Sequence, residues 1–159
     1  MSDLNFLNQV ENNPDYWSFS DTPQAYSMEL LIEYINQAHR SIEEVGQERF
    51  VIALTDETPV GFVDLYDFNV THQRAGVGII IEKEYRSMGY AKQALGLICD
   101  YASQQLSLHQ LYATIIKDNH ESCALFKQVG FTKTAVKKEW HHKDGIFVDE
   151  YLFQYLFEK

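Results

Sequence analysis

Residues 79–92 have the sequence IIIEKEYRSMGYAK, in which a run of β-branched residues passes through a short polar loop directly into a helix. The first turn of such a helix presents unpaired backbone N–H groups and a partial positive charge, and both favour a bound phosphate. Arg86 and Lys92 place fixed positive charge on either side of the loop, Gly89 permits a backbone conformation that other residues avoid, and Ala91 leaves the helix start uncrowded. The segment therefore predicts a pyrophosphate cradle, although an R-x-x-G-x-A pattern alone is also compatible with an ordinary turn.

Two other nucleotide-binding motifs are absent from the sequence. It contains no G-x-x-x-x-G-K-[ST], which excludes a P-loop NTPase. Gly76-x-Gly78 begins like a dinucleotide fingerprint, but Ile81 stands at the third glycine position and the pair lies inside a predicted strand. Glycines spaced by two instead clear one face of that strand, which predicts either a backbone-lined groove for a ligand or a bulge.

The first third of the chain has a helical pattern. Apolar residues three apart predict a helix over 3–12, with Ser2 or Asp3 as its cap. An aromatic loop with Tyr16, Trp17 and Phe19 is expected next, followed by a second helix that Ser27 caps. The buried stripe predicted for the second helix consists of Met28, Leu31, Ile32, Ile35 and Ala38.

From Phe50 onward, β-branched and aromatic residues predict strands that later alternate with helices. The expected elements are three successive antiparallel strands within 50–82, a helix over about 89–106, a strand over 111–116, a helix over about 120–129 that Gly130 ends, and a closing hairpin around the turn at 143–145. This order predicts one domain over 1–159 of the α/β or α+β class, with a mixed sheet and helices.

Charge and cysteine content narrow the function. The net charge is −10, and residues 1–67 carry 13 acidic and two basic side chains, whereas residues 68–159 carry 10 acidic and 11 basic ones. The acidic half is either a solvated face or a surface that meets a cation, and the overall balance disfavours nucleic acid as a partner.

No membrane span or signal peptide is visible. Cys99 and Cys123 form no C-x-x-C pair, so we expect no disulfide and no metal site, and a cytoplasmic location.

A second signal follows the predicted strand 111–116. The strand ends at Lys117, Asp118 and Asn119, and the sequence NHESCALFKQVGF comes next. Asn119 at a strand terminus can bond the peptide-like groups of a ligand, or it can simply cap the following helix. The residues alone leave both roles open.

Together these two signals, a strand followed by R-S-M-G-Y-A-K and then Asn119-x-x-Ser122-x-x-Leu125-Phe126-x-x-x-Gly130-Phe131, closely resemble the GNAT superfamily of acetyl-CoA-dependent N-acetyltransferases. Within it, the chain is most similar to the branch of spermidine N-acetyltransferases and ribosomal-protein N-terminal acetyltransferases. The resemblance extends from about residue 8 to the C-terminal hairpin. It implies a mostly antiparallel sheet flanked by helices, with acetyl-CoA as the co-substrate.

The resemblance also implies roles for individual residues. The backbone of Ile79 and Ile81, with Ile80 between them, would pair with the pantetheine arm as an added strand. Asn119 and Ser122 would contact the pantetheine or the adenosine end, and the region near Phe126 would lie by the sulfur. The pyrophosphate would be held by the amides around Arg86, Ser87, Met88, Gly89, Tyr90, Ala91 and Lys92.

The donor site departs from the family at Phe126. Many members have a tyrosine there that protonates the departing thiolate, and phenylalanine has no proton to give. Another group or water could supply the proton, the thiolate could leave unassisted, or the protein could be catalytically weak. We therefore assign no catalytic residue, and a non-catalytic acyl-CoA-binding or regulatory module is the alternative to an enzyme.

The acidic half is where this superfamily builds its acceptor side, so we expect a primary amine of a polyamine-like molecule or of a peptide. Polyamine-acetylating relatives commonly have an acid near Asp67 and another near Gly76; this chain keeps the first and lacks the second. Strand alternation would put Asp64 and Asp67 on opposite faces unless a bulge intervenes. A solvated carboxylate at Asp67 is the alternative to a substrate contact.

Other candidates on the acceptor side have simpler explanations. His141 and His142 precede the last turn, where a histidine is more often solvent-facing than catalytic. Trp17 and Trp140 could wall a pocket, although packing in the core or rim is the simpler expectation. Relatives usually begin with a further strand, so we expect an open sheet edge that is exposed or covered by a second copy in a homodimer or higher homo-oligomer.

Overall fold

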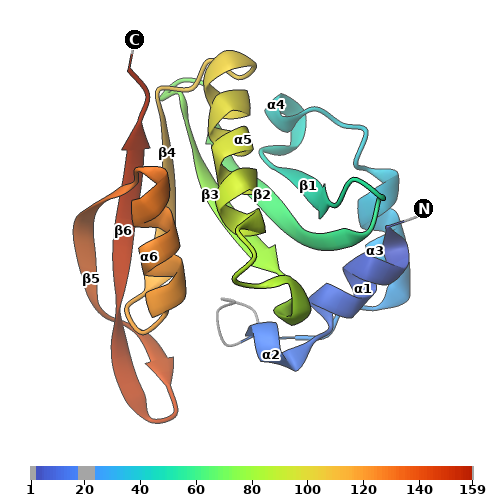
Figure 1. The fold of residues 1–159 in the computed structure, drawn as a ribbon, viewed down its shortest axis with the longest axis horizontal. Helices are drawn as coiled ribbons and strands as arrows, with labels where there is room; N and C mark the ends of the chain where they lie inside the picture. Colours follow the sequence, from blue (N-terminus) through green and yellow to red (C-terminus); the bar gives the residue numbers. More distant parts are fainter. Residues whose placement is uncertain (1–2, 18–23, 159) are drawn as a thin grey trace.

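The computed structural model describes residues 3–17 and 24–158 and shows a sheet with helices on both faces (Figure 1). The helices are α1 (Leu4–Glu11), α2 (Pro14–Trp17), α3 (Met28–Asn36), α4 (Ile42–Val45), α5 (Tyr90–Gln104) and α6 (His120–Val129), with a 3₁₀ turn η1 (Lys83–Tyr85). The strands are β1 (Glu48–Ala53), β2 (Pro59–Asn69), β3 (Arg74–Ile81), β4 (Gln110–Ile116), β5 (Thr132–Lys143) and β6 (Ile146–Leu156).

The six strands form one mixed sheet in the order β1-β2-β3-β4-β6-β5. All neighbouring pairs are antiparallel except β3 and β4, which are parallel and are connected through α5. This confirms the predicted mixed, mostly antiparallel sheet with flanking helices. In the described part of the chain no strand precedes α1, and β1 forms one edge of the sheet.

Two apolar clusters cover the two faces of the sheet. On one face, α5 and α6 bury side chains such as Leu95 and Phe126 against Leu65 and Phe153. On the other face, α1 and α3 pack around Phe62. Successive residues of β2 point to opposite faces, so Val63 and Leu65 belong to the first cluster and Phe62 to the second.

The amino-terminal third differs from the prediction in three places. The expected aromatic loop contains the short helix α2, because Pro14 suits a first helical turn and the Asn13 side chain accepts from the Asp15 amide. The short helix α4 was not predicted. In α3 the Ser27 cap is confirmed, but of the predicted stripe only Leu31 is buried; one side of α3 meets α1 and Phe62, and Ala38 lies beyond the helix end.

Phe19 and Ser2 lie outside the described residues, so their predicted places stay untested. Across the residues that the structure does describe, every helix is too short or too polar to cross a lipid bilayer.

Candidate functional site

The central feature of the site is a gap between β3 and β4. The two strands pair only through Arg74–Gly76 and Gln110–Tyr112, although both continue beyond these residues. In Figure 1 they run side by side near the top of the view and separate below it, toward the start of α5. A gap between neighbouring strands leaves backbone groups of both strands without a strand partner, and an extended ligand can bond to them.

The backbone of β3 directs particular groups into this gap. The Glu82 amide donates to the Val60 carbonyl at 2.9 Å, and because strand hydrogen bonds alternate, even-numbered residues of β3 bond to β2. The N–H and C=O groups of Ile79 and Ile81 therefore point away from β2, toward the gap, while Ile80 bonds to β2. The two residues predicted to pair with an extended ligand thus lie where such a ligand could reach them.

The predicted phosphate cradle lies at the end of β3. The loop turns through two left-handed residues, Ser87 at φ 61° and Gly89 at φ 85°, and Gly89 is the N-cap of α5. No side chain among the described residues caps this helix, so the amides of Tyr90, Ala91 and Lys92 remain available. Met88 and Lys92 are exposed. A 15-residue helix with an uncapped N-terminus beside cationic side chains suits an anionic group.

Arg86 is more constrained than the sequence suggested. Its Nε donates to the Ile81 carbonyl at 3.0 Å, and its guanidinium carbon lies 5.5 Å from the centre of the Tyr16 ring. Burial and the charge of Glu82 raise the pKa of Tyr16. Helix α2 thus packs against the loop and holds Arg86 in place. Arg86 donates to the Ile81 carbonyl, whereas the Ile81 amide still points into the gap.

The start of α6 contains the second predicted group of donor residues. Asn119 Oδ1 accepts from the Ser122 amide at 3.1 Å, so this side chain does cap α6, one of the two roles left open by the sequence. Phe126 is 3% exposed and packs edge-on against Phe131 at 5.0 Å between ring centres. Phe126 therefore belongs to the core beneath α6, and it contributes no ionisable group.

At one end of the gap β3 and β4 still pair, and on the sheet face opposite to α5 and α6 an aromatic ring covers this closed end. Gly76 is paired with Tyr66 on one side and Tyr112 on the other. A Cβ on Gly76 would overlap the Tyr66 ring, whereas one on Gly78 would lie 3.8 Å from it. The groove predicted at Gly76-x-Gly78 is thus filled at Gly76 by a side chain of the same protein. The sequence did not indicate Tyr66, because its place depends on the β2–β3 register.

Asp67 lies next to this ring. The register of β2 and β3 shifts between Tyr66 and Asn69, and Asp67 has a φ of 49°, so a bulge is present. The bulge brings the Asp67 carboxylate to the same face as Asp64, where it accepts from the Tyr112 hydroxyl at 2.9 Å. Burial and this hydrogen bond raise the pKa of Tyr112. Asp67 itself is exposed, so its carboxylate can meet a cation from solvent.

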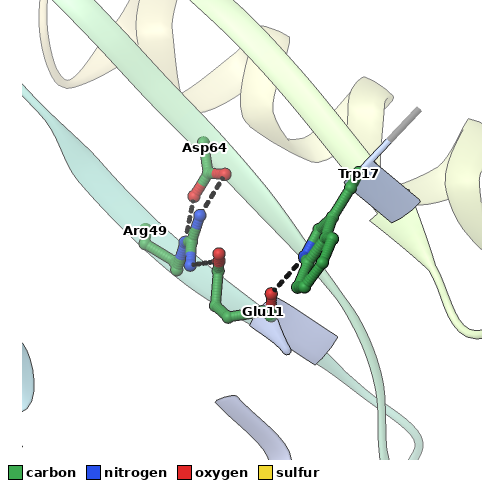
Figure 2. A network of polar contacts seen from close by, with 4 residues as sticks. All are labelled: Glu11, Trp17, Arg49 and Asp64. Atoms are coloured by element: carbon green, nitrogen blue, oxygen red, sulfur yellow. Dashed lines mark hydrogen bonds and ion pairs between the residues drawn. The ribbon is translucent and has the colours of Figure 1, made fainter. Parts of the chain in front are cut away.

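Asp64 is already neutralised by a cation of the protein. Arg49 donates to both its carboxylate oxygens, at 2.6 Å through Nε and 2.9 Å through Nη2, and also to Glu11 (Figure 2). Burial disfavours the charged form of Arg49, but the hydrogen bonds and charges of Asp64 and Glu11 outweigh it and raise its pKa. Trp17 donates from Nε1 to the Glu11 carbonyl at 2.9 Å, which ties α2 to this network.

The hairpin of β5 and β6 corrects the expectation for one histidine. His141 is not solvent-facing: its Nε2 lies 2.6 Å from Glu150, a buried carboxylate that also accepts from Lys137 at 2.6 Å. His142 is exposed beside Phe147. Trp140 is 60% exposed with the Lys137 ammonium over its ring, so it lies outside the core.

Comparisons with known proteins agree with this geometry. A family profile described as acetyltransferase (GNAT) domain matches residues 1–132. The chain is similar to the spermidine N(1)-acetyltransferase of Escherichia coli K12, at 31% identity over 133 residues that cover 82% of this chain and 68% of the relative. It is also similar to the Vibrio cholerae spermidine N(1)-acetyltransferase, at 28% identity over 147 residues, or 92% and 80% of the two chains.

The likeness extends to solved structures. The Vibrio cholerae spermidine N-acetyltransferase in complex with CoA and spermine matches with a TM-score of 0.87 at 26% identity, and the match covers 98% of this chain and 90% of that chain. The described sheet and its flanking helices therefore have a counterpart that has been observed with a CoA ligand.

Proposed function

The chain belongs to the GNAT acetyltransferase family, and on that premise we propose that it transfers the acetyl group of acetyl-CoA to a primary amine of a polyamine. The family membership confirms the resemblance found in the sequence, with acetyl-CoA as the co-substrate. The single observation that carries the proposal is the β3–β4 gap, which has amides of β3 along one side and the uncapped start of α5 at its open end.

The donor side fits acetyl-CoA at two points. The amides of Ile79 and Ile81 point into the gap, where an extended amide-containing chain can add as a strand. The amides at the start of α5, with Arg86 and Lys92 nearby, suit the pyrophosphate. Acetyl-CoA supplies the acetyl group as an activated thioester. Amides directed into the gap can stabilise negative charge on the thioester oxygen during transfer.

The acceptor side supports a cationic amine. Residues 1–67 carry the whole acidic excess, and the exposed Asp67 carboxylate lies near the closed end of the gap without an ion-pair partner among the described residues. The relatives named for spermidine and the structural neighbour with spermine support a polyamine as the acceptor. A primary ammonium has a pKa of about 10.4, and a nearby carboxylate stabilises that charged form. Asp67 therefore favours capture, and the ammonium proton must leave by another route, such as water.

The proposal is tested by free-thiol release from acetyl-CoA across spermidine, spermine, linear diamines, an aminoglycoside and a peptide with a free N-terminus. We expect the highest kcat/KM with the polyamines. Thiol release no faster than hydrolysis with every amine would sink the enzymatic assignment, and a preference for the peptide would replace the polyamine with a protein acceptor.

A second function is favoured by one observation, the buried Phe126 in place of a tyrosine. A non-catalytic acyl-CoA-binding module with this fold would bind acetyl-CoA without turnover. Phe126→Tyr separates the two: a gain in rate indicates an enzyme that lacks an efficient acid, whereas acetyl-CoA binding without turnover in both forms indicates a binding module. Phe131→Tyr is the matched control, because it adds a hydroxyl to the ring that packs against Phe126.

A further inference from the structure

The ring of Tyr66 fills the space that a side chain at Gly76 would need. A Cβ built on Gly76 would overlap Cε2 and Cζ of the Tyr66 ring and lie 2.8 Å from Cδ2. A Cβ on Gly78, two residues further along β3, would make an ordinary contact of 3.8 Å with the same ring. The ring therefore covers β3 from Gly76 to Gly78 and requires the missing side chain at Gly76.

This ring lies where the pairing of β3 with β4 ends. Gly76 is the last residue of β3 that pairs with β4, so Tyr66 covers the closed end of the gap. The ring of Tyr112 meets it nearly perpendicular, at 80° and 5.9 Å between centres, and the Tyr112 hydroxyl bonds to Asp67. Two aromatic rings and one carboxylate thus border the same small region.

We propose that Tyr66 determines acceptor specificity by narrowing this end of the gap, so that an unbranched aminoalkyl chain is accepted and an amine with a bulky group beside its nitrogen is excluded. The inference rests on the proposed function, since it assumes that the acceptor amine reaches the gap from this face. An aromatic wall also suits such a chain, because methylenes pack against a ring and an ammonium is attracted to its π-system.

The test compares two dications of different width, 1,4-diaminobutane and 1,4-bis(aminomethyl)benzene. The quantity measured is the ratio of their kcat/KM values, in which general losses of activity cancel. We expect Tyr66→Ala to shift this ratio toward the ring-containing diamine by about tenfold or more, the scale on which pocket space discriminates substrates. Tyr66→Leu removes the ring with less loss of volume and is expected to shift the ratio in the same direction, and Tyr66→Phe to leave it within about twofold.

The Gly76 contact supplies an independent arm. Gly76→Ala forces the ring to move and is expected to change the ratio, whereas Gly78→Ala is the matched control and should leave it unchanged. In a Tyr66→Ala background, Gly76→Ala should have no further effect, because the overlapping ring is gone.

Two results would overturn the inference. If Tyr66→Ala and Tyr66→Leu lower kcat/KM for both diamines by the same factor, Tyr66 has only a structural role. If the wild type acetylates neither diamine, the ratio is measured as dissociation constants by calorimetry with CoA present, and the proposed function fails only if spermidine and spermine are not acetylated either. An unchanged ratio of dissociation constants in Tyr66→Ala, or no binding of either diamine to the wild type, then refutes the role of Tyr66.

Discussion

Asp64 and Asp67 lie three residues apart on β2 and reach the same face of the sheet, yet their surroundings are opposite. Asp64 receives two hydrogen bonds from Arg49, a guanidinium that also bonds Glu11 and has a quarter of its side chain exposed. Asp67 is exposed and receives one hydrogen bond from the neutral hydroxyl of Tyr112. The first carboxylate is part of the framework, and the second is free to attract a cation.

The difference shows why an acidic composition does not by itself locate a cation site. A carboxylate that already has a fixed guanidinium partner offers little net field to an incoming ammonium. A hydroxyl partner leaves the negative charge in place and only orients it. Among the acids of the first 67 residues, the neighbours of each carboxylate therefore decide whether it binds substrate or stabilises the fold.

The largest effect is expected from removing the shared cation. Arg49→Leu leaves Asp64 and Glu11 facing each other without a counter-charge, and we expect a loss of roughly 2–4 kcal/mol in the free energy of unfolding, somewhat below the value for a fully buried pair. Urea unfolding measures it. As a control, Arg40→Leu removes a guanidinium from an exposed pair with Glu44 and should cost little. Equal effects in the two variants would contradict the structural role of Arg49.

A smaller stability loss is expected at Asp64. Asp64→Asn keeps one acceptor for Arg49, and Glu11 continues to bind it, so we expect about 1–2 kcal/mol of destabilisation. The kcat/KM for spermidine should stay within about twofold, because this carboxylate is already paired. A selective loss of activity in a variant of undiminished stability would show that Asp64 contacts the acceptor.

Asp67→Asn should have the opposite effect to Asp64→Asn, a loss of activity with nearly unchanged stability. Removing the open carboxylate is expected to lower kcat/KM for spermidine by about tenfold, the size of one charge-assisted contact, with little change in unfolding. Added salt should lower the wild-type kcat/KM more than that of Asp67→Asn, since the screened attraction is missing from the variant. Asp56→Asn, in the exposed β1–β2 turn, is the matched control. Identical salt dependence in wild type and Asp67→Asn would refute a direct role in capture.

The local geometry of the proposed donor side was predictable from the sequence and that of the proposed acceptor side was not, for a physical reason. The strand, loop and helix from Ile79 to Lys92 are consecutive, so the uncapped helix start and the left-handed Gly89 follow from local residue types. The shared face of Asp64 and Asp67 depends on a bulge, which the sequence left open and only the pairing of β2 with β3 decides. The ring of Tyr66 over Gly76 likewise depends on that register.

Arg49 was missed although a signal was available. It is one of two basic residues among the first 67 and directly precedes the first predicted strand, where a charged side chain that turns inward needs a partner. Its partner Glu11 comes from α1, far away in the sequence, so only the packing of α1 on the sheet identifies the pair. Local chemistry could be inferred from the sequence, whereas contacts between distant elements required the structure.

The smallest expected effect tests the partner of Asp67. Tyr112→Phe removes the hydroxyl that bonds Asp67 and is expected to cost about 0.5–1.5 kcal/mol at pH 8. Folding raises the pKa of Tyr112 above the unfolded value near 10. The contribution of its neutral hydroxyl to the free energy of unfolding is therefore complete below pH 10 and declines as the pH rises further. Urea unfolding at pH 8, 9, 10 and 11 should therefore show that the difference in free energy of unfolding between wild type and Tyr112→Phe becomes smaller at the highest pH.

Tyr101 offers a matched tyrosine–carboxylate pair away from the gap. Its hydroxyl bonds Glu48 at 2.9 Å, and burial together with this contact raises its pKa to about 12. Tyr101→Phe should show the same narrowing with pH but leave the kcat/KM for spermidine unchanged, whereas Tyr112→Phe should lower it, because Asp67 loses the hydroxyl that orients it. If both variants keep wild-type kcat/KM, the orientation of Asp67 does not matter for capture, and its difference from Asp64 reduces to the absence of a guanidinium partner.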